Sequence, residues 1–168
     1  HFGKAAYIAK ARVHLMRDFG AQASPQNAFL LNLGLETLAL RMQRHCQNAQ
    51  QLACFLEKND KVEWVNYPGL PQNPYYSLAQ KYMPGGSCGV ISFGVKGGRE
   101  AAAKLMEALQ IGAIVTHVAD VRTCVLHPAS TTHRQMTDQQ LQQAGITPNM
   151  IRLSVGIEDV NDLLADFA

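Results

Sequence analysis

A chain of 168 residues is long enough for one sizeable domain, and its formal net charge of +2 is too small to indicate a nucleic-acid or membrane partner by itself. Apolar residues make up 47% of the sequence and charged residues 17%, which is typical of a globular protein. Its apolar stretches end well before the roughly 20 residues that a membrane helix needs, and the N-terminus has no signal-peptide pattern. We therefore expect a cytoplasmic protein.

Four cysteines, Cys46, Cys54, Cys88 and Cys124, are scattered along the chain. They form no C-x-x-C pair, and no histidine stands at the spacing of a zinc ligand. We expect free thiols and no metal site. A disulfide pair stays open, because sequence alone does not test its geometry.

Apolar residues at three- and four-residue spacing predict a first helix over Lys4 to Asp18, with Gly20 just beyond its end. Ser24 is a good N-cap for a second helix, because its hydroxyl can accept a hydrogen bond from a free backbone N–H of the first turn. The proline that follows it also suits the first helical position. The apolar stripe continues without interruption, which predicts one long helix over Pro25 to Lys58. Gly34 inside this helix indicates a kink or a close contact.

The rest of the chain alternates short strand and helix patterns, which predicts an α+β domain with helices packed on a small, mainly antiparallel sheet. Thr137 and Gln140 form a capping-box pattern for one of its helices, which is expected to end at Gly145. The first predicted strand starts at Val62 and ends at Pro68-Gly69. The other predicted strands are Cys88 to Val95, Ile111 to Val115, Thr123 to Leu126 and Ile151 to Val155. The other predicted helices are Tyr76 to Tyr82, Arg99 to Leu109 and Glu158 to Phe167.

Arg152 is the most informative polar residue, because it interrupts an apolar strand. Alternation places Ile151, Leu153 and Val155 on one face of this strand and Arg152 with Ser154 on the other. A guanidinium has a planar fork of donors that suits a carboxylate. The partner is either a substrate carboxylate or an acidic side chain of the protein, and spacing alone favours a structural ion pair or an exposed edge position over a ligand-binding role.

Two polar segments offer further candidates. The segment His127 to His133 follows a strand, where loops often carry functional groups, but its hydroxyl side chains favour a capping role over catalysis. His117 is similarly open between a satisfied, partly buried side chain and a ligand-binding one. No lysine, serine or cysteine stands in a pattern typical of a nucleophile, so no catalytic residue is predicted in this chain.

Short segments along nearly the whole chain, in a fixed order, resemble the Cys/Met metabolism family of pyridoxal-phosphate enzymes. Two of them, Val62 to Pro68 and Ser130 to His133, look more like O-acetylhomoserine sulfhydrylases than like cystathionine synthases or lyases. The segments are Phe2-Gly3, Ala5-Ala6-Tyr7-Ile8, Ser24-Pro25, Gly34-Leu35-Glu36-Thr37-Leu38, Arg41-Met42, His45-Cys46, Val62-Glu63-Trp64-Val65-Asn66-Tyr67-Pro68-Gly69-Leu70, the loop His127 to His133, and Ile151 to Asp159.

The resemblance implies the aspartate-aminotransferase-type fold of these enzymes, with this chain as the C-terminal small domain. Residues 1–58 are then the leading helices, including the long helix that connects to a preceding coenzyme domain, and residues 59–168 are the α+β substrate-binding subdomain. Family members of this kind replace the acetate of O-acetylhomoserine with sulfide, giving homocysteine, and a homo-oligomer is expected.

The resemblance also implies the site residues. Arg152 matches the family arginine that binds the substrate α-carboxylate, and Thr132 matches a loop threonine expected to support that site. His117 stands where relatives carry Ser or Asn near the same carboxylate, which is a departure from the family pattern. The Schiff-base lysine and the phosphate-binding glycines of the family belong to the preceding domain, so we expect no bound pyridoxal phosphate and no turnover from this chain alone.

Two other functions stay open. One is a cystathionine γ-synthase or γ-lyase of the same family. The other is a non-catalytic module that self-associates through the first two helices, because these helices are expected to leave apolar surface uncovered.

Overall fold

A computed structural model describes residues 3–168, so Phe2, the first residue of the family-like segments, lies outside the described residues. The chain divides into two compact units between Ala39 and Leu40. The division into leading helices (residues 1–58) and a substrate-binding subdomain (residues 59–168) is one of function, and it stays a prediction.

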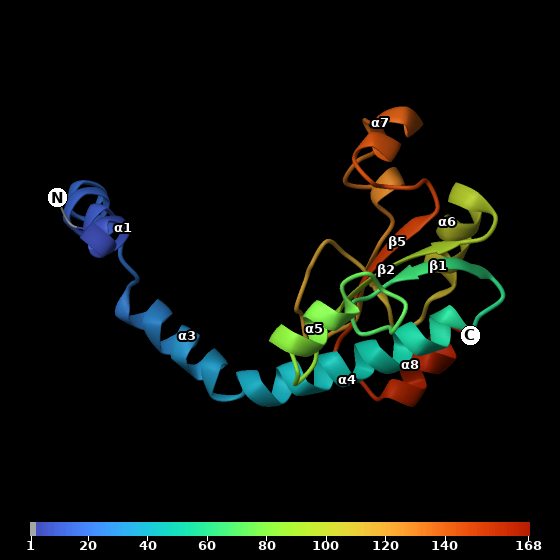
Figure 1. The fold of residues 1–168 in the computed structure, drawn as a ribbon, viewed down its shortest axis with the longest axis horizontal. Coiled ribbons are helices and arrows are strands. Elements are labelled where there is room, and N and C mark those ends of the chain that lie inside the picture. The colour runs from blue at the N-terminus through green and yellow to red at the C-terminus, as the bar shows by residue number, and fades with distance from the viewer. Residues whose placement is uncertain (1–2) are drawn as a thin grey trace. The chain divides into compact units, whose positions relative to one another are not determined.

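The first unit is helical (Figure 1). Its first helical run confirms the helix predicted from Lys4 and ends where Gly20 adopts a left-handed φ of 64°. The middle of this run is a π-helix, which the spacing did not predict. In the next helix the Ser24 side chain accepts a hydrogen bond from the backbone N–H of Asn27, as expected of an N-cap. The elements are η1 Gly3–Ala5, α1 Ala6–Ala9, η2 Lys10–Met16, α2 Arg17–Phe19 and α3 Pro25–Glu36.

The prediction of one continuous helix from Pro25 to Lys58 was wrong. The helix stops at Glu36, because Thr37 has φ −108° and ψ 6°, and α4 then spans Leu38–Glu57. The break therefore lies three residues after Gly34, although glycine is a poorer helix former than threonine. A Cβ added at Gly34 would meet no atom within 4 Å, so there is room for a side chain at this position.

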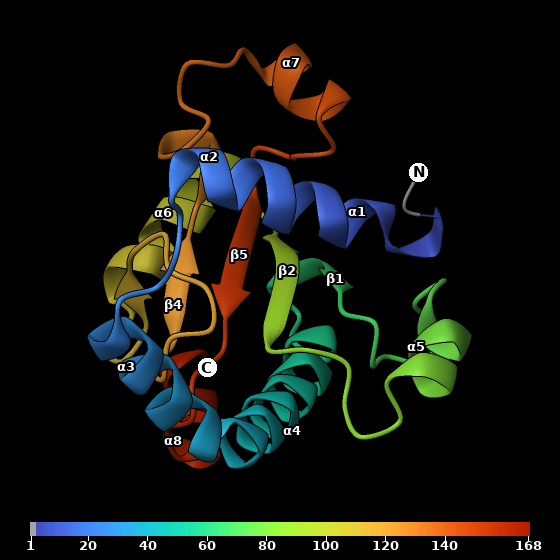
Figure 2. The same cartoon turned by 90° about the vertical axis from the view of Figure 1, so that its left-hand side faces the viewer.

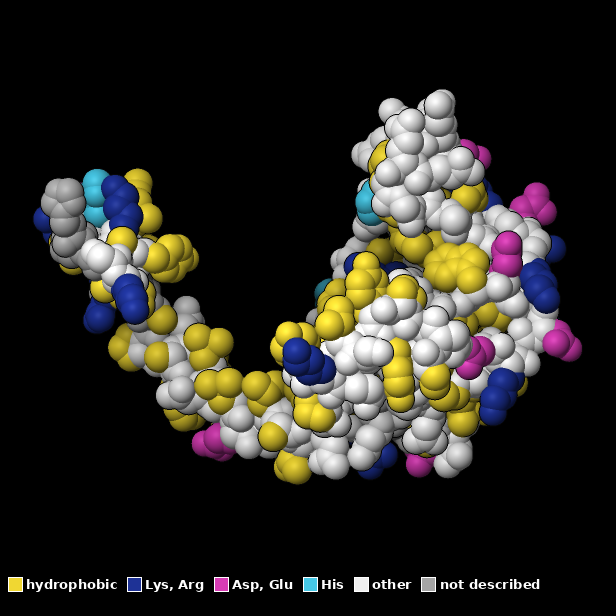
Figure 3. All heavy atoms as spheres, in the orientation of Figure 1, with side chains coloured by type: hydrophobic (Ala, Val, Ile, Leu, Met, Phe, Trp, Pro, Cys, Tyr) yellow, Lys and Arg dark blue, Asp and Glu magenta, His cyan; other side chains and the backbone are white. Residues whose placement is uncertain are grey.

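No residue between Gly3 and Ala39 is buried. Hydrophobic side chains are visible along this unit in Figure 3, and several of them are large. Those at least half exposed are Tyr7, Ile8, Val13, Phe19, Phe29, Leu30, Leu31, Leu33 and Leu35. The expectation of uncovered apolar surface on the leading helices is therefore confirmed for residues 3–39.

The second unit is built on a five-stranded sheet in the order β1-β2-β5-β4-β3. Three of its four strand pairs are antiparallel, which confirms the predicted mainly antiparallel sheet, and only β3 pairs in parallel with β4. The strands are β1 Val62–Asn66, β2 Val90–Val95, β3 Ala113–Ile114, β4 Cys124–Leu126 and β5 Met150–Ser154.

Helices cover one face of this sheet (Figure 1). The core packs β-strand residues such as Phe93, Ile151 and Leu153 against Leu52 of α4 and Leu163 of α8. Figure 2 shows the central strands β2, β5 and β4 side by side. The remaining helices are α5 Tyr76–Tyr82, α6 Gly98–Ala108, η3 Pro128–Ser130, α7 Asp138–Gln143 and α8 Val160–Asp166, and the capping box of Thr137 and Gln140 opens α7 as predicted. Among residues 3–168, none of the helices is both long and apolar enough to cross a membrane.

Candidate functional site

Arg152 lies in the middle of the central strand β5. Its backbone pairs with Ser92 of β2 on one side and Leu126 of β4 on the other. Its neighbours Ile151 and Leu153 are fully buried in the core, so strand alternation places the Arg152 side chain on the opposite face of the sheet. This confirms the two faces predicted for the strand.

The Arg152 guanidinium is only partly satisfied by the protein. Its Nη2 donates to the backbone carbonyl of Thr116 at 2.9 Å, whereas its Nε is buried and has no hydrogen-bond partner. Among residues 3–168 it forms no ion pair with an acidic side chain. A buried donor without a partner costs about 1–3 kcal/mol, so an anion bound here would recover free energy that the chain alone leaves unused.

A cavity of about 320 Å³ opens beside Arg152. Thr132, from the loop after β4, lines the same cavity, so the structure brings together two of the residues predicted to bind substrate. The Thr132 hydroxyl lies 2.8 Å from Nδ1 of the neighbouring His133. The cavity is lined by Val90, Ser92, Leu126, Pro128, Thr132, His133, Ile146, Met150 and Arg152.

The loop that carries Thr132 is held by its own polar side chains. His127 is buried, and its two ring nitrogens lie 2.8 Å from Ser130 Oγ and 2.8 Å from the carbonyl of Pro148. The Thr131 hydroxyl donates to the carbonyl of His127 at 2.7 Å. The structural role expected for these residues is therefore confirmed, and this bonding fixes the position of the loop.

His117 does not line this cavity. Its side chain is exposed, and its Nδ1 lies 3.3 Å from Oδ2 of Asp120. The backbone N–H and side chain of Arg122, followed by His117, hold the pKa of the Asp120 carboxyl well below its ordinary value. His117 directly follows Thr116, whose carbonyl accepts a hydrogen bond from Arg152.

Ser154 is a site residue whose role the sequence did not reveal. It lies two residues after Arg152 on the same face of β5, and its Oγ accepts a hydrogen bond from the N–H of Ala119 at 3.0 Å. The two side chains thus hold the loop between β3 and β4 at two points. Alternation placed Ser154 beside Arg152, but the contact with Ala119 depends on tertiary structure.

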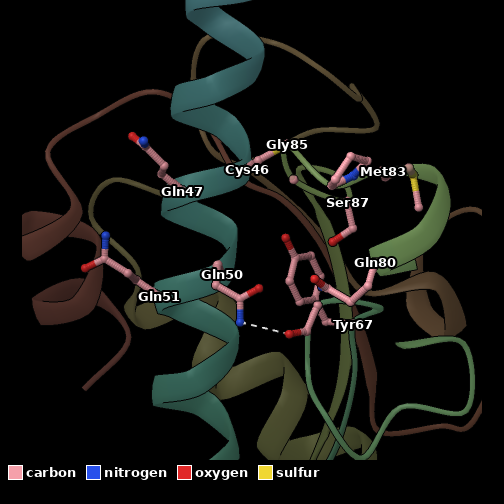
Figure 4. Close-up of a pocket in the computed structure, with 12 residues that line it drawn as sticks. Cys46, Gln47, Gln50, Gln51, Tyr67, Gln80, Met83, Gly85 and Ser87 are labelled. Atoms are coloured by element: carbon pink, nitrogen blue, oxygen red, sulfur yellow. Dashed lines mark hydrogen bonds between the residues drawn. The ribbon is translucent and has the colours of Figure 1, made fainter. Parts of the chain in front are cut away.

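A second and larger cavity, of about 420 Å³, lies beside α4 (Figure 4). None of the side chains that line it within residues 3–168 is charged. Gln50 donates from its side chain to the carbonyl of Gly69 at 3.1 Å, and the Tyr67 hydroxyl donates to the carbonyl of Cys88 at 2.9 Å. Burial raises the pKa of Tyr67 to about 12 and also raises the pKa of the Cys46 thiol. Without a cation, this cavity is a poor site for a carboxylate.

The described residues do not fit pyridoxal phosphate, the coenzyme that the family resemblance implies. Every lysine of the chain is exposed, whereas a lysine that holds a coenzyme needs an enclosed position. Gly97 and Gly98 adopt left-handed φ values of 98° and 70° in the turn that opens α6, but the spacing of these glycines is not that of a phosphate-binding loop. No residue of this chain is therefore assigned to the coenzyme.

Comparison with known proteins gives the same family. The chain is 48% identical over 167 residues to a homocysteine synthase of Schizosaccharomyces pombe, covering 99% of this chain and 39% of that protein. It is 47% identical to O-acetyl-L-homoserine sulfhydrylase 1 of Thermus thermophilus, covering 98% of this chain and 39% of that protein. The chain thus spans about two fifths of the length of these relatives.

A crystal structure of a putative O-acetylhomoserine (thiol)-lyase from Campylobacter jejuni superposes with a TM-score of 0.86 at 40% identity, over 96% of this chain and 38% of that one. That crystal structure contains an N'-pyridoxyl-lysine-5'-monophosphate. The model of the Cys/Met metabolism PLP-dependent enzyme family matches residues 3–168. The chain therefore belongs to the pyridoxal-phosphate-dependent enzymes of Cys/Met metabolism.

Proposed function

We propose that this chain is the C-terminal part of a pyridoxal-phosphate-dependent O-acetylhomoserine sulfhydrylase, in which it holds the α-carboxylate of the substrate. The observation that carries the proposal is the Arg152 guanidinium, which lines an open cavity and has a buried Nε without a partner. The relatives named as sulfhydrylases and homocysteine synthases support the reaction.

Arg152 would bind the carboxylate through its donors that remain after the contact with Thr116. A guanidinium forms paired hydrogen bonds with a carboxylate, which fixes the orientation of the carboxylate as well as its position. The Thr116 carbonyl keeps the guanidinium from rotating, so little side-chain freedom remains to be lost on binding. A substrate held in this way presents its reacting atoms in one orientation, which raises the rate as well as the affinity.

Thr132 and His117 have supporting roles in this proposal. Thr132 offers a hydroxyl at the wall of the same cavity. His117 would donate a hydrogen bond to the carboxylate only after it turns away from Asp120, 3.3 Å from its ring nitrogen. We therefore expect Arg152 to contribute most of the binding free energy.

The proposed reaction replaces acetate with sulfide and gives homocysteine, in an enzyme of the transferase class. The coenzyme chemistry belongs to parts of such an enzyme outside this chain, so the chain alone is expected to be inactive. A cytoplasmic homo-oligomer stays a prediction.

Two alternatives have distinct tests. A cystathionine γ-synthase of the same family would use cysteine rather than sulfide as the nucleophile, and a γ-lyase would need no added nucleophile. Assays of the whole enzyme with sulfide, with cysteine and without either therefore distinguish the sulfhydrylase, the γ-synthase and the γ-lyase. The uncovered apolar side chains of residues 3–39 favour a self-association module. That alternative requires a reading frame without a lysine-bearing coenzyme domain upstream of this chain.

The experiment that tests the proposal is the kinetics of Arg152→Ala in the whole enzyme. Loss of charge-assisted hydrogen bonds worth about 1.5–3 kcal/mol each should raise KM for O-acetylhomoserine by at least about tenfold. The absorbance of the bound coenzyme should not change. Arg44→Ala, which removes an exposed arginine of α4, is the control and should leave KM unchanged. An unchanged KM in Arg152→Ala would remove the proposed role.

A further inference from the structure

Three side chains of different chemistry meet in the segment between β3 and β4, outside the cavity of Arg152. They are His117, Asp120 and Cys124, and their ligand atoms all lie within 4.8 Å of one another. The imidazole is exposed, the carboxylate is partly buried and the thiol is buried at the start of β4. The spacing of these residues matches no common zinc motif, which is why the sequence predicted no metal site.

We propose that His117, Asp120 and Cys124 form a binding site for one thiophilic divalent cation of the zinc type. Imidazole and thiolate are the ligands that Zn²⁺ prefers, and a carboxylate is its common oxygen ligand. Mg²⁺ and Ca²⁺ prefer sets of oxygen ligands, so this combination selects against them.

The distances suit this cation after a small movement. Ligands at about 2.0–2.3 Å from a tetrahedral zinc ion stand roughly 3.4–3.6 Å from one another. The Nδ1 of His117 and the Oδ2 of Asp120 already lie 3.3 Å apart. The third donor, the Cys124 sulfur, lies within 4.8 Å of the other two ligand atoms. A shift of roughly 1 Å in the exposed loop would bring all three atoms to the separation that a tetrahedral zinc ion requires. Water would occupy the fourth position.

Two interactions have to give way when the ion binds. The Cys124 thiol donates to the carbonyl of Arg122 at 3.3 Å, and its proton would pass to solvent as the thiolate coordinates the metal. Asp120 accepts hydrogen bonds from the Arg122 side chain, whose positive charge competes with a cation. Because the Arg122 side chain is 65% exposed, it can turn into solvent without leaving a buried charge.

The site is separate from the carboxylate site but shares a segment of backbone with it. Thr116, next to His117, accepts a hydrogen bond from Arg152. An ion at this position would hold His117 toward Asp120 and away from the cavity of Arg152. The proposal does not rest on the sulfhydrylase activity, because it concerns only residues that the fold brings together.

Equilibrium dialysis of the whole protein against zinc, after removal of metals by a chelator, tests the site. Cys124→Ser should bind one ion fewer per chain than the unsubstituted protein, and His117→Asn should weaken binding of that ion by more than about tenfold. Because His117 is exposed, its substitution does not threaten folding. Cys88→Ser, which removes a thiol elsewhere in the chain, is the matched control and should keep the ion.

Arg122→Gln gives a test of opposite sign. Removing the competing guanidinium should tighten zinc binding, whereas a general loss of structure would weaken it. With Co²⁺ as the probe, a thiolate-to-cobalt charge-transfer absorbance should appear and should disappear in Cys124→Ser. The proposal would be overturned if the unsubstituted protein bound no zinc, or if Cys124→Ser and His117→Asn bound zinc as tightly and with the same stoichiometry as the unsubstituted protein.

Discussion

Ser154 Oγ accepts a hydrogen bond at 3.0 Å from the backbone N–H of Ala119, the one non-glycine residue among residues 3–168 with a positive φ, at 61°. Two residues earlier on the same strand, Arg152 donates to the carbonyl of Thr116. The strand that carries the proposed carboxylate-binding arginine therefore also sets the backbone of the loop that follows β3.

Ala119→Gly is expected to leave stability unchanged or to raise the free energy of unfolding by up to about 1.5 kcal/mol. A left-handed conformation costs a residue with a Cβ roughly 1–2 kcal/mol, and the greater freedom of glycine in the unfolded chain offsets about 0.4–1 kcal/mol of this. The control is Ala144→Gly, at φ −83°, which should lower the free energy of unfolding. Equal destabilisation in the two variants, measured by urea denaturation, would show that Ala119 is unstrained.

Ser154→Ala should loosen the loop and raise KM for the substrate severalfold in the whole enzyme. The reason is that Ala119 loses its partner, which leaves the bond from Arg152 to the Thr116 carbonyl as the remaining hold of this pair of side chains on the loop. The bound coenzyme should keep its absorbance. Ser77→Ala, on the exposed side of α5, serves as the control. A KM in Ser154→Ala that equals the control value would mean that the loop is positioned by other contacts.

Gly156→Ala should lower the free energy of unfolding by about 1–3 kcal/mol or more, because the added methyl group overfills a packed site. A Cβ at this position would lie 2.5 Å from the backbone nitrogen of Thr123 and 2.5 Å from the backbone oxygen of Val121. These atoms are tied down, since Glu158 accepts from the N–H and the hydroxyl of Thr123. Gly85→Ala, where no atom lies within 4 Å of the new Cβ, should have a much smaller effect under the same denaturant.

Tyr67 should ionise at a higher pH than a tyrosine in the unfolded chain. Burial raises its pKa from about 10 to about 12, so the folded state keeps the neutral phenol while the unfolded chain ionises. Its contribution to stability is complete below about pH 10 and is lost as the pH rises from about 10 to about 12. An absorbance titration should show one late step that disappears in Tyr67→Phe and remains in Tyr82→Phe, which removes an exposed ring. A late step that persists in Tyr67→Phe belongs to another residue.

Local sequence signals predicted most of the elements of the second unit. The helix Tyr76–Tyr82 was predicted with its observed bounds, because a proline-rich segment precedes it. Period-two alternation predicted the strand that starts at Val62, but this strand ends at Asn66, before the expected Pro68-Gly69. The orientation of Arg152 followed from the same alternation, since its apolar neighbours had to face the core. Its meeting with Thr132 in one cavity came from the family resemblance, not from spacing.

The remaining features depend on contacts between distant residues. The helix break at Thr37 was missed because an apolar stripe continues across it, and the stripe does not report the backbone angles. No sequence pattern predicted the burial of the polar residues His45 and Asn48 of α4. They bond to Val155, Gly156 and Glu158, more than a hundred residues later in the chain, and only the fold shows this.

The most direct test of the central claim measures the affinity of the whole enzyme for two ligands. One is an amino acid that the enzyme does not convert, and the other is the corresponding amine, which has the same side chain but lacks the α-carboxylate. If Arg152 holds the α-carboxylate, the unsubstituted enzyme binds the amino acid at least about tenfold more tightly, and Arg152→Gln abolishes the preference. A preference of the same size in Arg152→Gln would contradict the proposed role, because another group would then be holding the carboxylate.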